Sequence, residues 1–352
     1  LVWDHYYHGV AVARALVGTG LAGVVAPTLQ DLDGPGVAAC DVQLEATEEI
    51  ARSDYFAARG VFAALGPHAT DTVSEDLWRR AATMGAALDL PLHAHVAQSV
   101  DELRTSLERR GRPPLTWLAT GGLLDGLPAT MLAHCIYVSR QELELLDPAR
   151  DHLVFCPHSQ LVFGFPADPL VWEEGGVPWV MATDCSPSND SMNLQKELRF
   201  AAGQRTLPAT WSQAFRTFLD GADPAAAEDA WRAREAAFER ATAAVAPDRL
   251  LARVWDVPGG AHPGFRTGVI AEGALANLLV WDLDHPAFWP DEGLGALAMG
   301  DTTQAIHAMW VAGAEIGTAG DFHRSLVASG AYRDALAEAE SRRRRLPPVA
   351  AT

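Results

Sequence analysis

Short apolar segments alternate with amphipathic stretches along the first half of the chain. The segments that predict strands cover residues 1–8, 22–27, 61–65, 90–96, 131–134, 153–157 and 178–183. Helical apolar spacing lies between them, at residues 9–19, 44–58, 75–87, 99–110, 113–120, 139–146 and 168–175. Ser74, followed by two acidic residues, is a helix N-cap signal. Strands that alternate with helices in this way predict an α/β fold with parallel strands.

Three of the predicted strands end in ionisable side chains. The run Leu90–Gln98 carries His93 and His95, which are two positions apart and therefore face the same side of a strand. Two later runs end in His134 and Asp184. Because the C-terminal ends of barrel strands meet at one face, the pattern predicts a parallel barrel with a metal or acid/base site on that face.

The second half of the chain has a different pattern. Residues 222–250 are Ala-rich with interleaved charges, which predicts a helical hairpin or insertion. From about Gly264, short strands separated by Gly are predicted at Phe265–Ile270, Ala276–Asp282 and Ala305–Val311. We therefore expect a barrel at residues 1–250, a small β accessory domain at 251–325, and a C-terminal helix with a tail at 326–352.

Composition narrows the class of protein. The 352 residues carry a formal net charge of −18, which argues against a nucleic-acid partner because that role needs clustered Lys and Arg. No apolar run approaches the roughly 18 residues that suggest a membrane span. The four cysteines form no CxxC pair, which is typical of free thiols in a reducing compartment and predicts a cytoplasmic protein. These features favour an enzyme or binding protein for a small molecule.

Imidazole and carboxylate groups at convergent strand ends suit a divalent ion such as Zn²⁺. The alternative for His95 is a structural role as a hydrogen-bonded histidine of the core. His93 is equally suited to supporting a metal ligand without binding the metal itself. The alternative for Asp184 is to cap the next helix. As a carboxylate at a strand end, it can instead bind a metal weakly and accept a proton from water. Gln98 cannot titrate, so it orients a substrate without moving a proton.

Five motifs, taken together and in order, resemble the amidohydrolase superfamily. The nearest branch holds cytosine, guanine and 8-oxoguanine deaminases and triazine chlorohydrolases. Its pattern has a proline-His loop, H-x-x-E, A-H-C, C-P-x-S-N and T-D-G-x-x-S-N-x-S. The corresponding residues here are Gly66-Pro67-His68, His95-Val96-Ala97-Gln98, Ala133-His134-Cys135, Cys156-Pro157-His158-Ser159-Gln160 and Thr183-Asp184-Cys185-Ser186-Pro187-Ser188-Asn189-Asp190-Ser191.

The resemblance implies a distorted (β/α)₈ barrel beside a small β-sandwich, with one divalent metal that is Zn or alternatively Fe. His95 would be a metal ligand. Asp184 would be both a ligand and the general base, and His134 would hydrogen-bond the attacking water or the tetrahedral intermediate. Proteins of this kind are usually dimers, so the resemblance allows a homodimer, although the sequence shows no self-complementary surface.

The chain departs from that pattern at its start. The family takes two further histidine ligands from an H-x-H after the first barrel strand, and no such motif precedes Leu1. The strand at residues 1–3 is similar to the family's second, so we expect the first strand and both histidines to lie in a segment upstream of Leu1. A rival hypothesis makes His5 and His8 the replacement ligands.

Gln98 stands where the deaminases place a glutamate that protonates a ring nitrogen. The expected reaction is hydrolytic deamination of a small nitrogen heterocycle, narrowly ahead of hydrolytic dechlorination or amide-type C–N cleavage. A barrel that binds a small molecule without turning it over is the non-enzyme alternative. Pocket residues expected to contact substrate are His158, Tyr6, Trp3 and His68.

Overall fold

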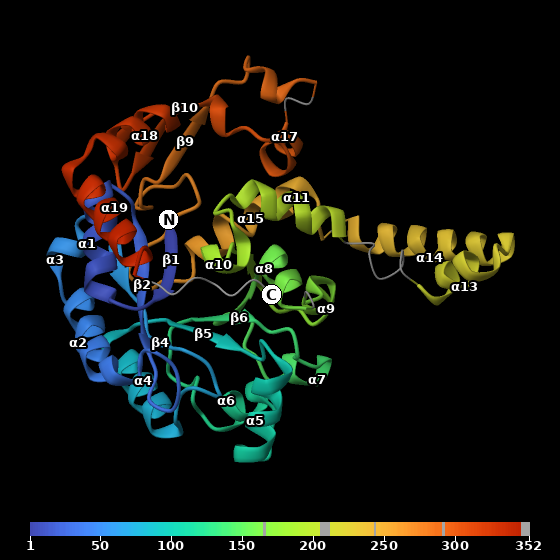
Figure 1. Cartoon of the computed structure of the whole chain (residues 1–352), viewed down its shortest axis with the longest axis horizontal. Helices are drawn as coiled ribbons and strands as arrows, with labels where there is room; N and C mark the ends of the chain where they lie inside the picture. Colours follow the sequence, from blue (N-terminus) through green and yellow to red (C-terminus); the bar gives the residue numbers. More distant parts are fainter. Residues whose placement is uncertain (165–166, 205–211, 243, 291–292, 346–352) are drawn as a thin grey trace.

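A computed structural model of the chain describes residues 1–164, 167–204, 212–242, 244–290 and 293–345. The first half contains parallel strands that follow one another in chain order around a common centre (Figure 1). They are β1 (Val2–Tyr6), β2 (Gly23–Leu29), β3 (Val61–Ala63), β4 (Gly66–Pro67), β5 (Leu92–Val96), β6 (Thr130–His134), β7 (Asp151–Phe155) and β8 (Trp179–Met181). Bridges from Leu65 and Ala69 join the first group of strands to β5. The predicted α/β fold with parallel strands is confirmed.

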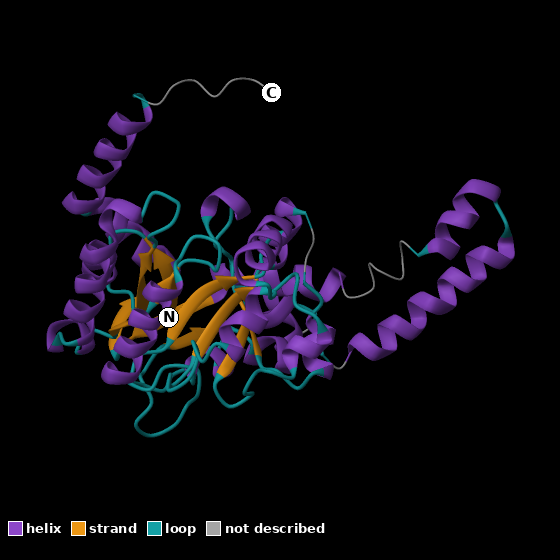
Figure 2. Ribbon diagram, turned by 90° about the horizontal axis from the view of Figure 1, so that it is seen from below, coloured by secondary structure: helices purple, strands orange, loops and turns teal. Residues whose placement is uncertain are grey.

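Helices connect these strands and cover their outer side (Figures 1 and 2). They are α1 (Gly9–Thr19), α2 (Cys40–Ala51), α3 (Asp54–Ala57), α4 (Glu75–Leu88), α5 (Val100–Arg110), α6 (Pro114–Thr120), α7 (Arg140–Leu143), α8 (Pro157–Phe163), α9 (Pro169–Glu174), α10 (Ser186–Asn189) and α11 (Leu194–Gln204), with a 3₁₀ turn η1 at Val37–Ala39. Ser74 caps α4 as predicted, because its side chain accepts a hydrogen bond from the Leu77 N–H.

Strand β5 shows how the hydrophobic pattern builds the core. Leu92, Ala94 and Val96 are fully buried in the large cluster between the strands and the helices. The alternate positions, His93 and His95, therefore face the centre that the strands surround. The sequence thus places apolar residues on the helix side of the strand and two imidazoles on its inner side.

A segment from the second half of the chain packs against the inner side of the strands. Ala261 and Val257 join Met131 and Val180 in a small apolar cluster. His262 lies beside it, where its Nε2 lies 3.0 Å from the Ala63 carbonyl oxygen. Within the described residues, β1 pairs with β2 and β8 with β7, and no strand joins β1 to β8.

The C-terminal part forms an antiparallel sheet, with β9 (Leu278–Trp281), β10 (Ile306–Val311) and β11 (Ala314–Gly317) in the order β11-β10-β9. Helix α18 (Ala319–Ala328) packs on β10 and β11, and α19 (Gly330–Arg343) follows it. The remaining short elements are α15 (Pro247–Ala252), α16 (Asp256–Gly259), α17 (Leu294–Met299), η2 (Pro286–Phe288) and η3 (Thr303–Ala305). The described residues show one sheet here, so the second layer of the expected sandwich is not confirmed.

The strand predicted at Phe265–Ile270 is wrong. This stretch is irregular, and its backbone is held by turns: the Thr267 N–H donates to Gly259, and the Leu275 N–H donates to the Arg266 carbonyl. Gly268 adopts φ +76°, which interrupts an extended strand. The apolar residues alone misled the prediction, because Phe265 and Val269 are only half-buried and Ile270 is exposed, so no regular strand packs this stretch into a core.

Two helices stand clear of the rest of the molecule in both views (Figures 1 and 2). They are α13 (Gln213–Gly221) and α14 (Pro224–Thr242), which pack against each other as a hairpin. We call this pair the arm. It overlaps the helical hairpin or insertion predicted at residues 222–250. Across the described parts of the chain, no helix combines the length and the apolar character needed to cross a membrane.

Candidate active site

Five histidine side chains gather where β1, β4, β5 and β6 end. The His95 ring stacks on His5, with centroids 4.7 Å apart, and on His134 at 5.4 Å. The ring centroid of His68, which follows β4, lies 4.9 Å from that of His95. The ring centroids of His93 and His5 are 5.2 Å apart. The strands therefore bring together the three histidines that the sequence singled out on β5 and β6, together with His68 and His5.

His95 is oriented by the backbone of the neighbouring loop. Its Nδ1 lies 2.8 Å from the carbonyl oxygen of His68, which can only accept a hydrogen bond. The proton of a neutral His95 therefore sits on Nδ1, and its Nε2 presents a lone pair. This is the arrangement in which a histidine ligates a metal while its other nitrogen is held in place.

Burial keeps these imidazoles uncharged. Burial, with repulsion from neighbouring rings, lowers the pKa of His68 to about 4. The same causes lower the pKa values of His93 and His134 to about 3. Burial also lowers the pKa of His95 and moves that of His5 well below the usual value. The cluster is therefore neutral at physiological pH, which is the form that binds metals and donates or accepts single hydrogen bonds.

Asp184 follows β8 and supplies the negative charge. Its Oδ2 accepts a hydrogen bond from the Ser159 hydroxyl, and its Oδ1 accepts one from the Cys185 N–H at 2.6 Å. Burial acts to raise the pKa of the Asp184 carboxyl, but the hydrogen bonds from the Ser159 hydroxyl and the Cys185 N–H outweigh it, so that the pKa lies below its usual value. Asp184 is therefore ionised beside neutral histidines.

Strained backbone conformations coincide with these side chains. Ala97, His134, Cys135 and Asp184 have φ values of +52°, +74°, +45° and +59°. Such values are uncommon for residues other than Gly and concentrate at functional sites. His134 shows the effect. It is two residues after Leu132 in β6, so a regular strand would point its side chain to the same side as Leu132, towards the core between the strands and the helices. The left-handed backbone turns the imidazole so that it stacks on His95.

Unpartnered buried atoms mark the same region. The described residues include buried side-chain nitrogens without a hydrogen-bond partner at His5, His93 and His134, all at Nδ1, and at Trp3 Nε1. An unsatisfied buried polar atom costs free energy comparable to a lost hydrogen bond. Several of them around one histidine cluster indicate a place where a ligand or ordered water completes the bonding.

The donor set fits a divalent metal in part. His95 offers a free imidazole lone pair and Asp184 an ionised carboxylate, and both are ligands that Zn²⁺ accepts. Within the described residues, however, no three His, Cys, Asp or Glu side chains are arranged to hold a metal ion. The two ligands and their two expected upstream partners stay predictions. Of the two histidines considered as replacement ligands, His5 lies in the cluster, whereas His8 is exposed at the start of α1.

The residues expected to contact substrate lie in different surroundings. Trp3 faces the inner space, 6.2 Å from His93. Tyr6 is 54% exposed, and its described ring contact is with Tyr7. The His158 ring packs on Phe200 of α11. The structure therefore brings Trp3 to the cluster, along with His68, while Tyr6 and His158 make their described contacts elsewhere.

Gln98 lies just beyond β5, where the chain enters α5. Its backbone N–H donates to Glu102 Oε2 at 2.8 Å, and Thr70 donates to Glu102 Oε1 at 2.6 Å. Glu102 therefore ties the loop after β5 to the loop after β4, which carries His68. No sequence spacing pointed to Glu102, because a carboxylate early in a helix is usually solvated.

A second carboxylate that sequence reasoning missed is Glu197 of α11. It is 2% exposed, and it accepts hydrogen bonds from the His158 N–H at 3.2 Å and from Asn189 Nδ2 at 2.9 Å. Asn189 Nδ2 also donates to the Thr183 carbonyl, next to Asp184. Glu197 thereby links the exits of β7 and β8. Asn189 lay within a recognised motif, but no pattern signalled the buried carboxylate.

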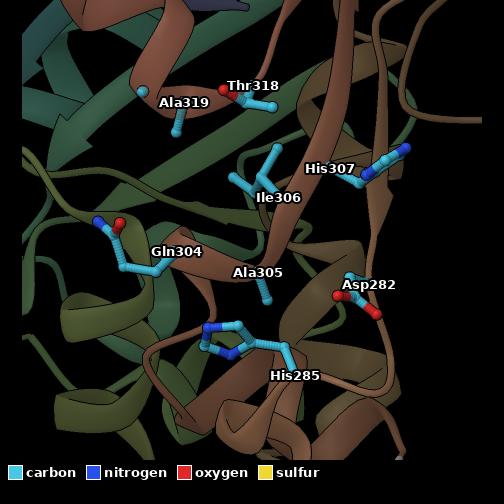
Figure 3. A pocket seen from close by; sticks show the side chains of 9 residues that line it. Asp282, His285, Gln304, Ala305, Ile306, His307, Thr318 and Ala319 are labelled. Carbon is cyan, nitrogen blue, oxygen red and sulfur yellow. The ribbon is translucent and has the colours of Figure 1, made fainter.

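A separate pocket of about 230 Å³ lies in the C-terminal part, between β10 and the start of α18 (Figure 3). Its lining includes Asp282, His285, Gln304 and His307. Figure 3 shows these side chains spread around the pocket rather than converging on one point. His285 Nδ1 already accepts a hydrogen bond from the Ala287 N–H at 3.1 Å. The convergent chemistry of the described residues is therefore that of the histidine cluster.

Known proteins resemble this chain in sequence and in structure. A 5-methylthioadenosine/S-adenosylhomocysteine deaminase from Archaeoglobus fulgidus is 26% identical over 83% of this chain and 61% of its own length. The solved structure of a zinc-bound adenosine deaminase from Xanthomonas campestris has a TM-score of 0.74 at 21% identity, over 97% of this chain and 70% of that one. A zinc complex of atrazine chlorohydrolase from Arthrobacter aurescens has a TM-score of 0.65 at 20% identity, over 90% and 67%.

The two structural likenesses establish the fold. The chain spans about three fifths of the length of the curated relatives it matches. A model of the amidohydrolase family matches residues 7–217, which is more than half of the chain and includes Asp184 and every histidine of the cluster except His5. The chain therefore belongs to the amidohydrolase family.

Proposed function

We propose that this protein is a metal-dependent hydrolase that removes an amino group from a small nitrogen heterocycle. The observation that carries the proposal is the pairing of neutral histidines with an ionised Asp184 at the C-terminal ends of parallel strands. Membership of the amidohydrolase family supports the same reaction class. A pure binding site gains little from an ionised carboxylate beside neutral imidazoles.

His95 and Asp184 would hold the metal, through His95 Nε2 and a carboxylate oxygen, together with ligands from an upstream segment. Zinc is the first choice and iron the alternative. A bound divalent metal would lower the pKa of water towards about 7, and so would supply a nucleophile at neutral pH. Zinc in solved structures with the same fold supports this choice of metal.

The residues of this chain would then move protons and stabilise charge. Asp184 is ionised and accepts the proton that the attacking water gives up. His134 is neutral and its Nδ1 is unpartnered, so that its ring is free to hydrogen-bond the oxygen of the addition intermediate. Gln98 orients the heterocycle with its carboxamide, which donates and accepts hydrogen bonds but delivers no proton.

The substrate class follows from the relatives. Curated proteins that this chain resembles are named as deaminases of 5-methylthioadenosine, S-adenosylhomocysteine and 5′-deoxyadenosine. We therefore take an adenosine-type nucleoside as the first candidate substrate. Trp3 and His68, which lie beside the histidine cluster, are the proposed substrate contacts. Tyr6 and His158 are kept as contacts for an outer part of the substrate.

Gln98 favours a second candidate reaction. A heterocycle that loses chloride needs no proton on its ring nitrogen, whereas loss of ammonia is helped by one. Hydrolytic dechlorination, or cleavage of an amide-type C–N bond, is therefore the alternative within the same site. A non-catalytic barrel that binds a small molecule is favoured instead by the lack of a three-ligand metal group in the described residues.

Some finer expectations belong with this proposal. They are a closed eight-stranded barrel completed by an upstream strand, a two-layered β-sandwich, the domain boundaries near residues 250 and 325, and a cytoplasmic location. In the strand count, β3 and β4 are one position, because both pair with β2, one after the other along it. The unpaired outer edges of β1 and β8 in the described residues support the first of these, because an added strand would satisfy their backbone groups.

The test combines metal analysis with product detection. The full chain, expressed with any upstream segment that its gene encodes, is grown with ample zinc and iron and analysed for metal, with Asp184→Ala as the control. We expect about one metal per chain and a clear reduction in the control. Ammonia and chloride release are then measured on 5-methylthioadenosine and on amino- and chloro-triazines.

Ammonia release from the nucleoside supports the deaminase. Chloride release without ammonia would replace it with the dechlorinase. Protein that stays free of metal under these conditions and releases neither product would contradict the hydrolase and favour the binding barrel.

A further inference from the structure

Side chains of α5 bind the loop after β4, residues 68–73. The Thr70 hydroxyl donates a hydrogen bond to Glu102 Oε1 at 2.6 Å. Two arginines near the end of α5 donate to the backbone carbonyls of Asp71 and Val73. Thr70 and Glu102 are 0% and 2% exposed, so water has no access to replace the bond between them. A hydrogen bond to a carboxylate in such a buried setting is stronger than one at the surface.

The same loop orients His95. The His68 carbonyl oxygen accepts a hydrogen bond from the His95 backbone N–H at 2.9 Å and another from His95 Nδ1 at 2.8 Å. Thr70 lies two residues further along this loop. A movement of the loop would therefore shift the acceptor that fixes the tautomer and the angle of the His95 ring. Loss of the groups that hold a histidine ligand in place typically weakens metal binding.

The other oxygen of Glu102 holds the turn after β5. Glu102 Oε2 accepts a hydrogen bond from the Gln98 N–H at 2.8 Å. Ala97, one residue earlier, has a φ of +52°, which is uncommon for a residue other than Gly and needs support from its surroundings. The Ser99 hydroxyl accepts a hydrogen bond from the Glu102 N–H, which fixes the start of α5. Glu102 therefore determines the direction in which Gln98 leaves the strand.

We propose that Glu102 is a positioning residue, which holds His95 and Gln98 in a fixed relation through its two carboxylate oxygens. We call the path from the Gln98 N–H through Glu102 to the Thr70 hydroxyl the Glu102 link. It joins the loop that orients the proposed metal ligand to the turn that directs the proposed substrate contact. The roles of His95 and Gln98 are those of the proposed function, on which this inference rests.

The first test breaks the Glu102 link at Thr70. Thr70→Val removes the hydroxyl and keeps the side-chain volume, whereas Thr70→Ser keeps the hydroxyl. Zinc affinity is measured on the full chain, with any upstream segment that its gene encodes, by competition with a chelator. We expect Thr70→Val to weaken zinc binding roughly tenfold, as for the loss of a group that supports a ligand. Thr70→Ser should retain the parent affinity.

Thr130→Val is the matched control. The Thr130 hydroxyl donates to Asp151 Oδ1 at 2.9 Å, and both residues are fully buried, but they lie at the opposite end of β6 from His134. Thr130→Val should therefore lower the urea midpoint of unfolding as Thr70→Val does, and leave zinc affinity unchanged. Equal losses of zinc affinity in the two variants would give Glu102 a purely structural role and overturn the proposal.

Glu102→Leu removes both acceptors at once. It should weaken zinc binding more than Thr70→Val does, and lower kcat more than it changes KM, because both the metal ligand and the substrate contact lose their support. Far-ultraviolet circular dichroism checks that the variant folds, and the Thr70 variants test the link if it does not. A folded Glu102→Leu protein with the parent kcat and zinc affinity would contradict the proposal.

A second readout needs no metal. In metal-free protein with isotope-labelled histidines, the nitrogen NMR spectrum shows which ring nitrogen carries the proton, and His95→Gln identifies the His95 signals. We expect the Nδ1–H form in the parent and in Thr70→Ser, and a mixture of the two tautomers in Thr70→Val. An unchanged His95 spectrum in Thr70→Val would overturn the proposal. A parent that binds no zinc would instead contradict the proposed hydrolase, and the His95 spectrum would then decide the role of Glu102 by itself.

Discussion

The Ser159 hydroxyl donates a hydrogen bond to Asp184 Oδ2, and so joins the helix that follows β7 to the end of β8. Ser159 is fully buried. Its hydroxyl also lies 2.8 Å from the Ser188 hydroxyl on α10. The carboxylate at the centre of the proposed reaction is therefore held by a neighbouring strand exit and not only by its own loop.

Ser159→Ala removes this donor from a buried, charged acceptor. We expect the free energy of unfolding to fall by about 1.5–3 kcal/mol, the usual contribution of a hydrogen bond to a charged group. We also expect kcat to fall more than KM rises, because the substitution changes the placement of the general base. Urea unfolding and steady-state kinetics measure the two effects.

Ser188→Ala is the control for that substitution. Ser188 lies next to Ser159 and bonds the Cys185 carbonyl, but it has no described bond to Asp184. Ser188→Ala should therefore lower the free energy of unfolding without a comparable loss of kcat. Equal effects of the two substitutions on kcat would show that the Ser159 bond has no special role in placing Asp184.

Glu197→Gln tests the carboxylate that links the exits of β7 and β8. An amide has one acceptor oxygen, so its NH₂ would face either the His158 N–H or the Asn189 side chain. We expect a loss of about 1–3 kcal/mol in unfolding free energy and a roughly ten- to hundredfold lower kcat, since small misplacements of reacting groups are costly. Glu108→Gln, on an exposed position of α5, is the control.

Gln98→Glu introduces the proton donor that the chain lacks. Metal content should stay unchanged, because the backbone N–H that bonds Glu102 is retained. The kcat/KM ratio for amino- over chloro-substituted heterocycles should rise, since ring protonation assists the loss of ammonia. Gln141→Glu adds the same charge at an exposed site and should leave the ratio alone. An unchanged ratio in Gln98→Glu would count against the assigned role of Gln98.

Asp4 should make stability depend on pH. Burial raises the pKa of its carboxyl from 3.8 to about 6, and its Oδ2 is buried without a described partner. A folded-state pKa above the unfolded value means that the stabilising contribution is complete below about pH 4 and is lost as the pH rises through about 6. Between those limits, its loss lowers the unfolding free energy by at most about 2–3 kcal/mol.

Asp4→Asn removes this titration. The difference in unfolding free energy between the parent and the variant, measured in urea at a series of pH values, should therefore change over that interval and level off above it. A difference that stays constant from pH 4 to pH 8 would show that the Asp4 carboxyl has an ordinary pKa in the folded protein.

The sequence by itself determined the fold class and the inner face of β5. Alternation of period two assigns Leu92, Ala94 and Val96 to one side of the strand and His93 and His95 to the other, because successive side chains of a strand point in opposite directions. The Ser74 cap was likewise visible, since its bond to the Leu77 N–H depends only on local sequence. Local physics decides such features before any tertiary contact forms.

Only the tertiary structure decided which side chains complete the site. Alternation along β6 assigns His134 to the same side as Leu132, and a left-handed backbone at the end of the strand turns the ring onto His95 instead. His5 and Glu197 join through contacts between segments far apart in sequence. Backbone strain and the partners of buried polar groups depend on packing between elements, and no local pattern records them.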